Sequence, residues 1–151
     1  HKLQLVGMTN KNNLDGALRE ALPGADVFIG VSKANLLTSS DVSLMAPKAI
    51  VFALANPVGE IMPDQAKKGG AWVVATGRSD FPNQINNSLA FPGIFKGALL
   101  AGATHITKDM KLAAAHAIAG LVKNPTADKI IPGPFEKGLV EAVATAVAKN
   151  I

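Results

Sequence analysis

The chain has 151 residues, enough for one domain with a sizeable core, and 48% of them are hydrophobic although only 5% are aromatic. Its 15 basic and 11 acidic residues give a formal net charge of +4, but the lysines form no basic stripe and have no aromatic platforms between them, so nucleic-acid binding is not expected. It has no run of ~18 apolar residues, no recognisable signal peptide and no cysteine, which argues against a membrane span, a disulfide and a thiolate site and is compatible with a cytoplasmic location.

The chain begins with His1 rather than Met, and its first residues read like the middle of an element, so we expect a piece of a longer protein. Three short apolar runs then follow: "ADVFIGVS" (25–32), "AIVFALAN" (49–56) and "AWVVATGR" (71–78). Each is continuous rather than alternating, which is typical of strands in a parallel sheet that is covered on both faces. Helical or turn signals lie between them, so the β-α-β-α-β order predicts an α/β fold with a parallel sheet.

The connecting segments carry helix start and stop signals. Asn13 is predicted to cap a helix whose leucines lie on one face. Ser39 or Ser40 is predicted to begin a second, short helix. Pro63 suits the first turn of a third helix, which Gly69-Gly70 should end before the last strand.

After the third run the pattern is helical only. Residues 83–103 are predicted to form a helix that is interrupted at Pro92-Gly93. Thr107 should cap the next helix, residues 124–134 should form a loop, and residues 136–149 should form a final alanine-rich helix.

Small or polar residues follow all three predicted strands. Ligands bind to open parallel sheets beyond the carboxyl ends of the strands. Turn-forming residues end most strands, but here they would bring Ser32, Asn56 and Arg78 to one edge of the sheet. We therefore expect a ligand-binding crevice at that edge.

The stretch "DFPNQINNSLAFPGIF" (80–95) places four side-chain amides directly after the third strand, at Asn83, Gln84, Asn86 and Asn87. Neutral amides bind carboxylates, carboxamides and ribose hydroxyls without adding a full charge. Helix capping could account for one or two of them, most naturally Asn83 or Asn86. The others indicate a dedicated polar ligand over the same edge of the sheet.

Other candidate residues are weaker. His116 falls on or near an apolar helical stripe, which favours a structural role, and Asp80 could belong either to the crevice or to a turn with a local ion pair. The chain has no G-x-G-x-x-G motif, no tyrosine and no adjacent acidic pair. The sequence thus offers part of a site without an obvious acid–base or metal centre.

Several stretches resemble the C-terminal, NAD(P)-binding region of bacterial malic enzymes. They are "ADVFIGVSKANLLT", "IVFALANPVGEIMP", "VVATGRSDFPNQINNSLAFPGIFKGAL", "MKLAAAHAIAGLV" and "IIPGPFEKGLVEAVATAVA". The resemblance implies a partial Rossmann-like, doubly wound parallel sheet with an all-helical C-terminal part. It also implies a decarboxylating malate dehydrogenase that converts malate to pyruvate and CO2 with NAD or NADP and a Mg or Mn ion. Residues 1–151 would be the distal portion of the cofactor-binding domain.

Site residues follow from the same resemblance. It implies that Asn56, Asn86 and Asn87 contact the substrate. It implies cofactor contacts from Ser32, Asn56, Gly77, Arg78 and Asn87.

The resemblance also indicates what this chain lacks. The family's general acid is a tyrosine, its general base is a lysine, and its metal ligands include a Glu-Asp pair, all in a preceding lobe. We therefore expect no catalytic residue and no metal ligand in this chain, and no activity from the chain alone. The expected partners are malate or pyruvate, the remainder of the enzyme and a second copy in a homodimer.

Two alternatives stay open at the level of sequence. The chain could be a non-catalytic α/β binding or oligomerisation module derived from that domain, because a sheet edge left unpaired favours association. It could also belong to another α/β nucleotide-binding protein such as an amino-acid dehydrogenase, against which the double-asparagine block argues.

Overall fold

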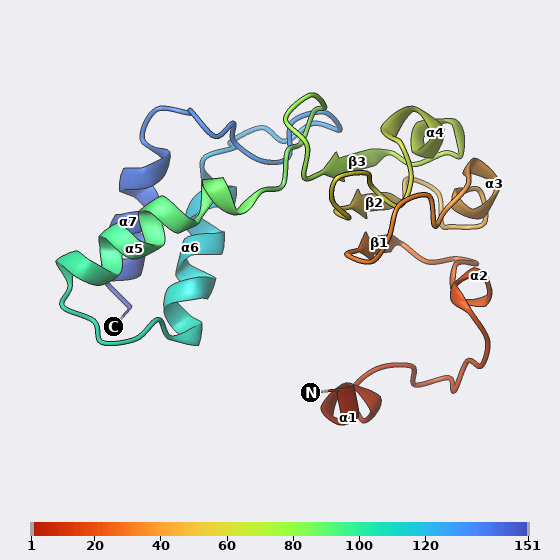
Figure 1. Cartoon of the computed structure of the whole chain (residues 1–151), viewed down its shortest axis with the longest axis horizontal. Coiled ribbons are helices and arrows are strands. Elements are labelled where there is room, and N and C mark those ends of the chain that lie inside the picture. The colour runs from red at the N-terminus through yellow and green to blue at the C-terminus, as the bar shows by residue number, and fades with distance from the viewer. Residues whose placement is uncertain (1, 151) are drawn as a thin grey trace.

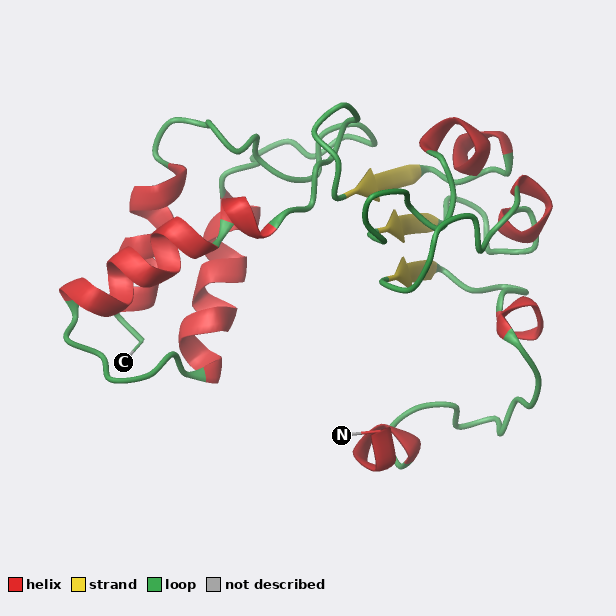
Figure 2. Cartoon of the chain, in the orientation of Figure 1, coloured by secondary structure: helices red, strands yellow, loops and turns green. Residues whose placement is uncertain are grey.

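The three apolar runs form three parallel strands, and the later helical segments form a separate helical half (Figures 1 and 2). In this computed structural model, which describes residues 2–150, the α/β fold class and the helical C-terminal part are confirmed. His1 and Ile151 lie outside the described residues. The elements are α1 (Lys2–Val6), α2 (Leu18–Ala21), β1 (Val27–Gly30), α3 (Ser39–Val42), β2 (Ile50–Ala53), α4 (Pro63–Lys68), β3 (Val73–Thr76), the 3-10 helix η1 (Asn87–Leu89), α5 (Phe91–Leu100), α6 (Lys108–Gly120) and α7 (Leu139–Ala148).

The strands pair in the order β1-β2-β3, and each pair is parallel. Val27 lies beside Ile50, which lies beside Val73, so the three strands are in step along their whole length. All three carboxyl ends therefore meet at one edge of the sheet, as the sequence predicted. Each strand has four residues and is shorter than the apolar run that contains it.

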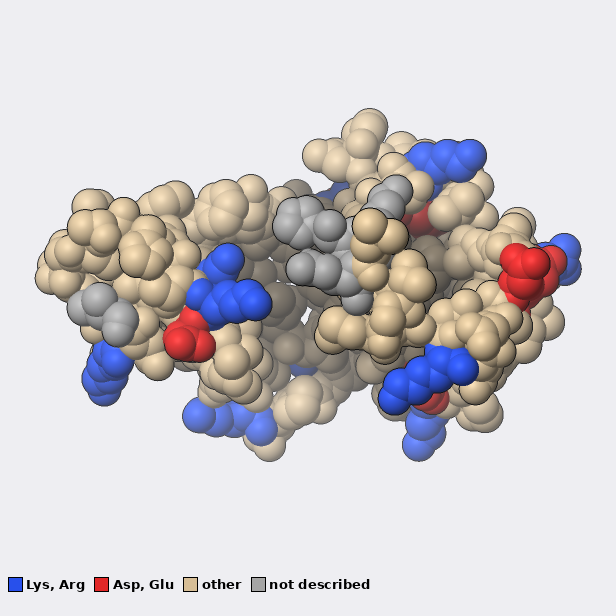
Figure 3. Space-filling model, turned by 90° about the horizontal axis from the view of Figure 1, so that it is seen from below, with Lys and Arg blue, Asp and Glu red and all other residues tan. Residues whose placement is uncertain are grey.

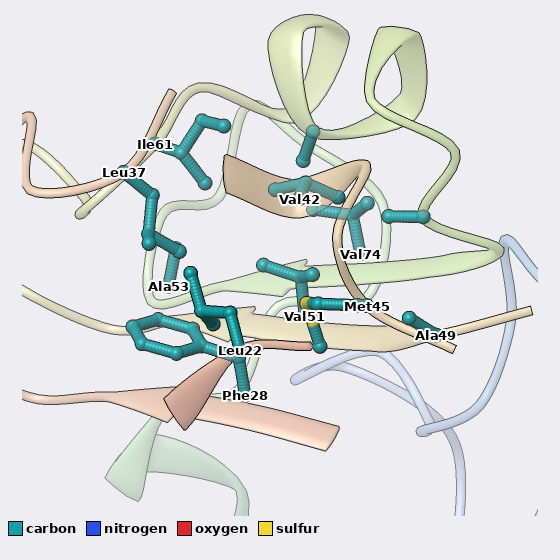
Figure 4. Close-up of a cluster of buried hydrophobic side chains, with 12 residues drawn as sticks. Leu22, Phe28, Leu37, Val42, Met45, Ala49, Val51, Ala53, Ile61 and Val74 are labelled. Atoms are coloured by element: carbon teal, nitrogen blue, oxygen red, sulfur yellow. The ribbon is translucent and has the colours of Figure 1, made fainter. Parts of the chain in front are cut away.

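One face of the sheet packs against the segments that carry α2, α3 and α4. The side chains of Phe28, Val51 and Val74 form one row across the strands and point into this layer. Figure 4 shows them with Leu22, Val42 and Met45 from the surrounding helices and turns. Burial of each such apolar side chain contributes about 1.5–3 kcal/mol, so this layer is the main stabilising contact of the sheet half.

The opposite face is covered unevenly by the described residues. Val73 and Ala75 of β3 are 7% and 0% exposed, whereas Val27 and Ile29 of β1 are 47% and 63% exposed. Part of the loop of residues 124–131 lies beside β3, where Pro125, Ala127 and Ile130 share a hollow with Val73. The continuous apolar pattern predicted cover on both faces, and within residues 2–150 that cover is complete only at β3.

The helix predicted after Asn13 is much shorter than expected. It spans only Leu18–Ala21, and the residue that precedes it is Ala17. Asn13 instead adopts a left-handed conformation with φ of 49°, which is incompatible with an N-cap residue. The side-chain oxygen of Asn10 accepts the backbone N–H of Leu14 at 2.8 Å and holds this segment in a turn.

The two helices that follow begin close to their predicted starts. Thr38, rather than Ser39 or Ser40, caps α3, and its hydroxyl oxygen accepts the backbone N–H of Asp41 at 3.2 Å. Pro63 occupies the first turn of α4, and Gly69 follows its last residue. The predictions for Pro63 and Gly69 are confirmed, and so is the predicted start of the second helix, because α3 begins at Ser39.

The helix predicted over residues 83–103 is also shorter. The amide-rich part of that stretch is not α-helical, since Asn83 has a φ of 56°, Gln84 bridges to β3 and Asn87 begins η1. The helix α5 therefore starts only at Phe91. Pro92 therefore lies in the first turn of α5 and does not kink it. A proline in the first turn costs nothing, because its missing N–H would have no helical partner there.

The last two helices match their predictions more closely. The Thr107 hydroxyl accepts the backbone N–H of Met110 at 3.1 Å and caps α6. Residues 124–134 form a loop, and α7 begins three residues later than predicted. These helices and α5 share a second core, which consists of Leu89, Ile94, Ala98, Met110, Ala114, Leu139, Val143 and Val147.

Helices α5 and α7 approach each other closely because glycines line their contact. A Cβ atom added to Gly93 would lie 2.4 Å from the Cβ of Val143. One added to Gly97 would lie 2.5 Å from the backbone oxygen of Ala144. The two glycines thus set the spacing of the helical half, which holds the segment before α5 in place. None of the helices described within residues 2–150 combines the length and the apolar character that a membrane crossing requires.

We expect Gly97→Ala to destabilise the chain by about 1–2 kcal/mol, because the added methyl group meets a backbone atom of α7 that cannot turn aside. This net loss assumes a steric cost of about 2–3 kcal/mol, from which the roughly 1 kcal/mol that alanine gains over glycine in a helix is subtracted. Urea denaturation measures the difference. Gly120→Ala at the end of α6 is the matched control, because nothing lies within 4 Å of its added methyl group. Equal stability of the two variants would contradict the close packing.

Candidate functional site

A cavity of about 630 Å³ lies beyond the carboxyl ends of β2 and β3. Residues 54–56 after β2, residues 77–80 after β3 and residues 84–87 before α5 form its walls. It lies where the strand-end pattern predicted a crevice. Of the three residues predicted to share this edge, Asn56 and Arg78 line the cavity and Ser32 does not.

Backbone contacts with β3 hold the third wall in place. Ile85 donates its backbone N–H to the carbonyl of Thr76 at 2.8 Å, and Gln84 forms a parallel bridge with Thr76. The side-chain amides of Gln84 and Asn86 both donate to the carbonyl of Gly77, at 3.4 and 3.3 Å. The segment therefore runs alongside the end of β3 like a short additional strand, and its next residue, Asn87, faces the cavity.

The four amides divide into bound and unbound groups. Asn86 caps η1, since its side-chain oxygen accepts the backbone N–H of Ser88 at 3.0 Å. This confirms the capping role considered for Asn86. Asn87 is exposed, and its side chain makes no hydrogen bond to any residue in the range 2–150. Asn56, on the opposite wall, is likewise exposed and has no side-chain hydrogen bond among the described residues.

Asn83 is a structural residue and does not line the cavity. Its side chain is 6% exposed and donates to the carbonyls of Val74 at 3.0 Å and Ala127 at 2.8 Å. Its side-chain oxygen accepts the backbone N–H of Ile130 at 2.9 Å. Of the two amides considered for capping, only Asn86 has that role, and Asn83 instead ties β3 to the loop before α7. All the hydrogen bonds come from residues distant in the sequence, so local pattern could not show them.

Arg78 and Asp80 form an ion pair at the mouth of the cavity. The guanidinium donates twice to the carboxylate, at 2.8 and 2.6 Å, and lies 5.4 Å from the centre of the Phe81 ring. The hydrogen bond from Arg78 holds the pKa of Asp80 below its ordinary value. Both interpretations considered for Asp80 hold, because it forms the local ion pair with Arg78 and also lines the cavity. The charge of Arg78 is therefore partly balanced before any ligand arrives.

The sequence analysis did not single out Glu60, a buried carboxylate that connects the segment after β1 to the segment after β2. Glu60 is 0% exposed, and its two oxygens accept the backbone N–H groups of Ser32 at 2.7 Å and Ala55 at 3.1 Å. Ser32 is itself exposed at the end of β1. A single glutamate between Gly59 and Ile61 was the only local signal, and an isolated acidic residue in an apolar stretch is too common to be recognised alone.

The remaining candidate groups are His116, possible metal ligands and the basic residues. His116 is exposed on α6, so it does not lie on the apolar stripe, and the structural role favoured for it stays a prediction. Its position lies beside the stripe of Met110 and Ala114 rather than on it. Within residues 2–150 no three His, Asp or Glu side chains lie close enough to hold a metal ion. On the face shown in Figure 3 the Lys and Arg residues are scattered and do not gather into one large basic patch.

We expect Asn83→Ala to lower the free energy of unfolding by about 2–4 kcal/mol, because it leaves two carbonyls and one N–H without their partner in a buried site. Asn87→Ala is the matched control. It should change stability by less than about 0.5 kcal/mol, because that side chain is exposed and makes no such bond among the described residues. Chemical denaturation measures the free energy of unfolding of both variants. Equal losses of stability would contradict the conclusion that Asn83 is structural and Asn87 is not.

The ion pair gives a pH-dependent prediction. In Arg78→Gln, the pKa of Asp80 should rise toward its ordinary value, because the hydrogen bond that lowers it is lost. In the wild type the stabilisation from this pair is present above the ordinary carboxyl pKa and disappears as the pH falls through the lowered one. NMR titration of the carboxyl carbons measures the pKa of Asp80 in the wild type and in the variant. The pKa of Asp41, lowered chiefly by a hydrogen bond from the Thr38 side chain, should stay unchanged in the variant.

Known proteins share both the sequence and the fold. The family described as "Malic enzyme, NAD binding domain" matches residues 1–151. The bifunctional malic/malolactic enzyme of Bacillus subtilis (strain 168) is 55% identical over 150 residues, which cover 98% of this chain and 37% of that protein. The NAD-dependent malic enzyme of Geobacillus stearothermophilus is 51% identical over 144 residues, which cover 94% of this chain and 30% of that protein.

The crystal structure of the NAD-dependent malic enzyme from Thermotoga maritima superimposes with a TM-score of 0.93 at 48% identity, over 99% of this chain and 39% of that one. The chain thus spans less than two fifths of the length of each of these three proteins. The resemblance noted in the sequence is confirmed by the family match and by the solved fold. Since the match extends over residues 1–151, the chain belongs to the malic enzyme NAD-binding domain family.

Proposed function

We propose that this chain forms the cofactor- and substrate-contacting part of a malic enzyme, which oxidises malate and releases pyruvate and CO2 while NAD or NADP is reduced. The observation that carries the proposal is the pair of unbound amides, Asn56 and Asn87, on opposite walls of the cavity beyond β2 and β3. A folded chain leaves polar side chains without partners most readily where a ligand or solvent completes them. Membership of the family supports a nicotinamide and a C4 dicarboxylate as the ligands.

The donor set of the cavity fits such ligands. Its volume of about 630 Å³ lies within the range of small-molecule sites. Amide groups both donate and accept, so they match a nicotinamide carboxamide, ribose hydroxyls and a carboxylate. Gly77 adds space, because a Cβ atom there would meet only the backbone oxygen of Ile85 at 3.7 Å. The protein itself would tolerate a side chain at Gly77, so its absence leaves room for a ligand.

Each residue has a role within this proposal. Asn87 donates to the malate carboxylate and the nicotinamide carboxamide region, and Asn56 contacts the ribose and the substrate. Asn86 holds the wall between them through its bonds to Gly77 and Ser88, and so it acts on the substrate through position. Gly77 and Arg78 line the groove for the cofactor, and Ser32 contacts the cofactor from outside the cavity lining, in keeping with the resemblance.

A nicotinamide bound in this cavity would supply the hydride-acceptor chemistry, and Asn56, Asn87, Gly77 and Arg78 are the residues of this chain that would hold it. This chain orients the two reactants and excludes water from the space between them. The family resemblance implies that the ligands of the Mg or Mn ion and the acid and base lie in a preceding lobe, so we assign them to protein outside this chain. Residues 1–151 are then the distal portion of the NAD(P)-binding domain. The remainder of the enzyme and a second copy in a dimer are its proposed partners.

We expect Asn87→Ala, made in the full-length enzyme, to lower kcat/KM for malate by about 10- to 100-fold, equivalent to about 1–3 kcal/mol. The reason is the loss of one directional hydrogen bond to a ligand that is itself charged. Steady-state kinetics with varied malate at saturating cofactor measure it. Asn12→Ala is the matched control, because Asn12 is an exposed asparagine that does not line the cavity.

Several outcomes would contradict the proposal. Unchanged kinetics in Asn87→Ala would remove that residue from the site. A full-length protein that self-associates but binds neither NADH nor NADPH would instead favour the binding or oligomerisation module. Malate oxidation by the isolated 151-residue chain would show that the catalytic groups lie within it after all.

A further inference from the structure

We propose that Glu60 is a positioning residue, which fixes the strand-end loops after β1 and β2 so that they present Ser32 and Asn56 to the cofactor. This inference rests on the function proposed above and adds to it a residue that does not itself line the cavity. It stands on the burial of Glu60, on its hydrogen bonds and on the glycine against which it packs.

Glu60 links two loops that share no direct backbone pairing at these positions. The last ladder bond between β1 and β2 runs from the N–H of Leu54 to the carbonyl of Gly30 at 2.9 Å. Immediately beyond it, the strands separate, and one oxygen of Glu60 accepts the N–H of Ser32 while the other accepts the N–H of Ala55. The carboxylate thus continues the connection between the strands where the backbone ladder ends.

The backbone around Glu60 strengthens this connection. The carbonyl of Glu60 accepts the N–H of Leu37 at 2.9 Å, and the carbonyl of Gly59 accepts the N–H of Asn35 at 3.1 Å. The loop after β1 is therefore held at its start by the Glu60 side chain and further along by the backbone of the same short segment. Movement of Glu60 would displace both Ser32 and the residue before Asn56.

The carboxylate of Glu60 packs against Gly30, in the space that a side chain at that position would occupy. A Cβ atom added to Gly30 would lie 2.4 Å from the carboxyl carbon of Glu60. The last residue of β1 must therefore lack a side chain for the carboxylate to reach both N–H groups. Gly30 and Glu60 therefore form the bridge between the strand ends together, although 30 positions separate them in the sequence.

The chemistry of the bridge requires a carboxylate in particular. A carboxylate accepts hydrogen bonds at both oxygens, whereas a glutamine accepts at one end and donates at the other. In Glu60→Gln the amide NH2 would therefore face one of the two backbone N–H groups, donor against donor. An apolar residue would leave both N–H groups buried and unpaired, which is costly. Only the wild-type residue holds both loops at once.

The position of the bridge separates this role from general support of the fold. The main sheet core lies on the helix-covered face around Val51 and Val74. The core cluster reaches as far as Ala53 and Ile61, but the side chain of Glu60 accepts the N–H groups of Ser32 and of Ala55, the residue before Asn56, and neither of these two residues belongs to that cluster. Loosening the bridge should therefore disturb the cofactor edge more than the core.

The test compares Glu60→Gln with Glu20→Gln in the full-length enzyme. Glu20 is the matched control, because it also accepts a backbone N–H, from Ala17 at 2.9 Å, but is exposed and remote from the cavity. The dissociation constants of NADH and NADPH are measured by fluorescence titration. Hydrogen exchange of the peptides that contain Ser32 and Ala55 is measured in the cofactor-free protein, together with the Tm.

We expect Glu60→Gln to weaken binding of the preferred cofactor by about tenfold or more, as for loss of one buried hydrogen bond to a charged group. Exchange at Ser32 and Ala55 should become faster, and peptides from α6 should exchange as before. Glu20→Gln should change none of these. Saturating cofactor should restore most of the turnover in Glu60→Gln, which a general loss of folded protein would not allow.

The opposing results are equally distinct. Faster exchange with an unchanged dissociation constant would overturn the positioning role and leave a purely structural bridge. If Glu60→Gln does not fold, Glu60→Asp takes its place with the same expectation, since it keeps the charge but withdraws it by one methylene group. Failure of both variants to fold would also overturn the inference. A wild-type enzyme that binds no cofactor would refute the proposed function itself, whereas an active wild type with an unaffected variant would refute only the role of Glu60.

Discussion

The candidate site depends on one buried amide that joins the two halves of the molecule. The side chain of Asn83 bonds to the backbone of β3 at Val74 and to the loop before α7 at Ala127 and Ile130. These bonds fix the chain at the point where it leaves the sheet half and enters the helical half (Figure 1). The next residues are consequently held alongside the end of β3, which places Asn87 over the cavity.

The amides of residues 83–87 illustrate how one residue type serves two purposes. Asn83 and Asn86 satisfy their polar atoms within the protein, and this fixes the backbone between them. Asn87 keeps its amide for a ligand, and it is well oriented because its neighbours are already bound. Pre-organisation of this kind reduces the entropy that a ligand must otherwise overcome when it orders a loop. The cluster is therefore a rigid wall with one polar group left open, rather than four equivalent contacts.

Local signals in the sequence predict much of this arrangement, and distant contacts decide the rest. The three strands follow from continuous apolar runs, and Thr107 and Pro63 mark helix starts because caps act within one turn. Asn83 and Asn87 have the same chemistry and similar neighbours, but the loop contacts of Asn83 lie 44 and 47 residues away in the chain. The role of Glu60 could not be predicted for the same reason, because its hydrogen-bond partner Ser32 is 28 residues away in the chain.

The charges around the cavity indicate that this chain does not by itself neutralise a dianionic substrate. Among the described residues that line the cavity, Arg78 is the only cationic side chain, and Asp80 already engages it through two hydrogen bonds. Glu60 is likewise satisfied by two backbone N–H groups. Malate is a dianion, and a dianion held by neutral amides alone would keep most of its charge uncompensated. In the proposed function, this chain therefore supplies direction and spacing, and the balancing positive charge must come from groups that face the cavity from outside the described residues.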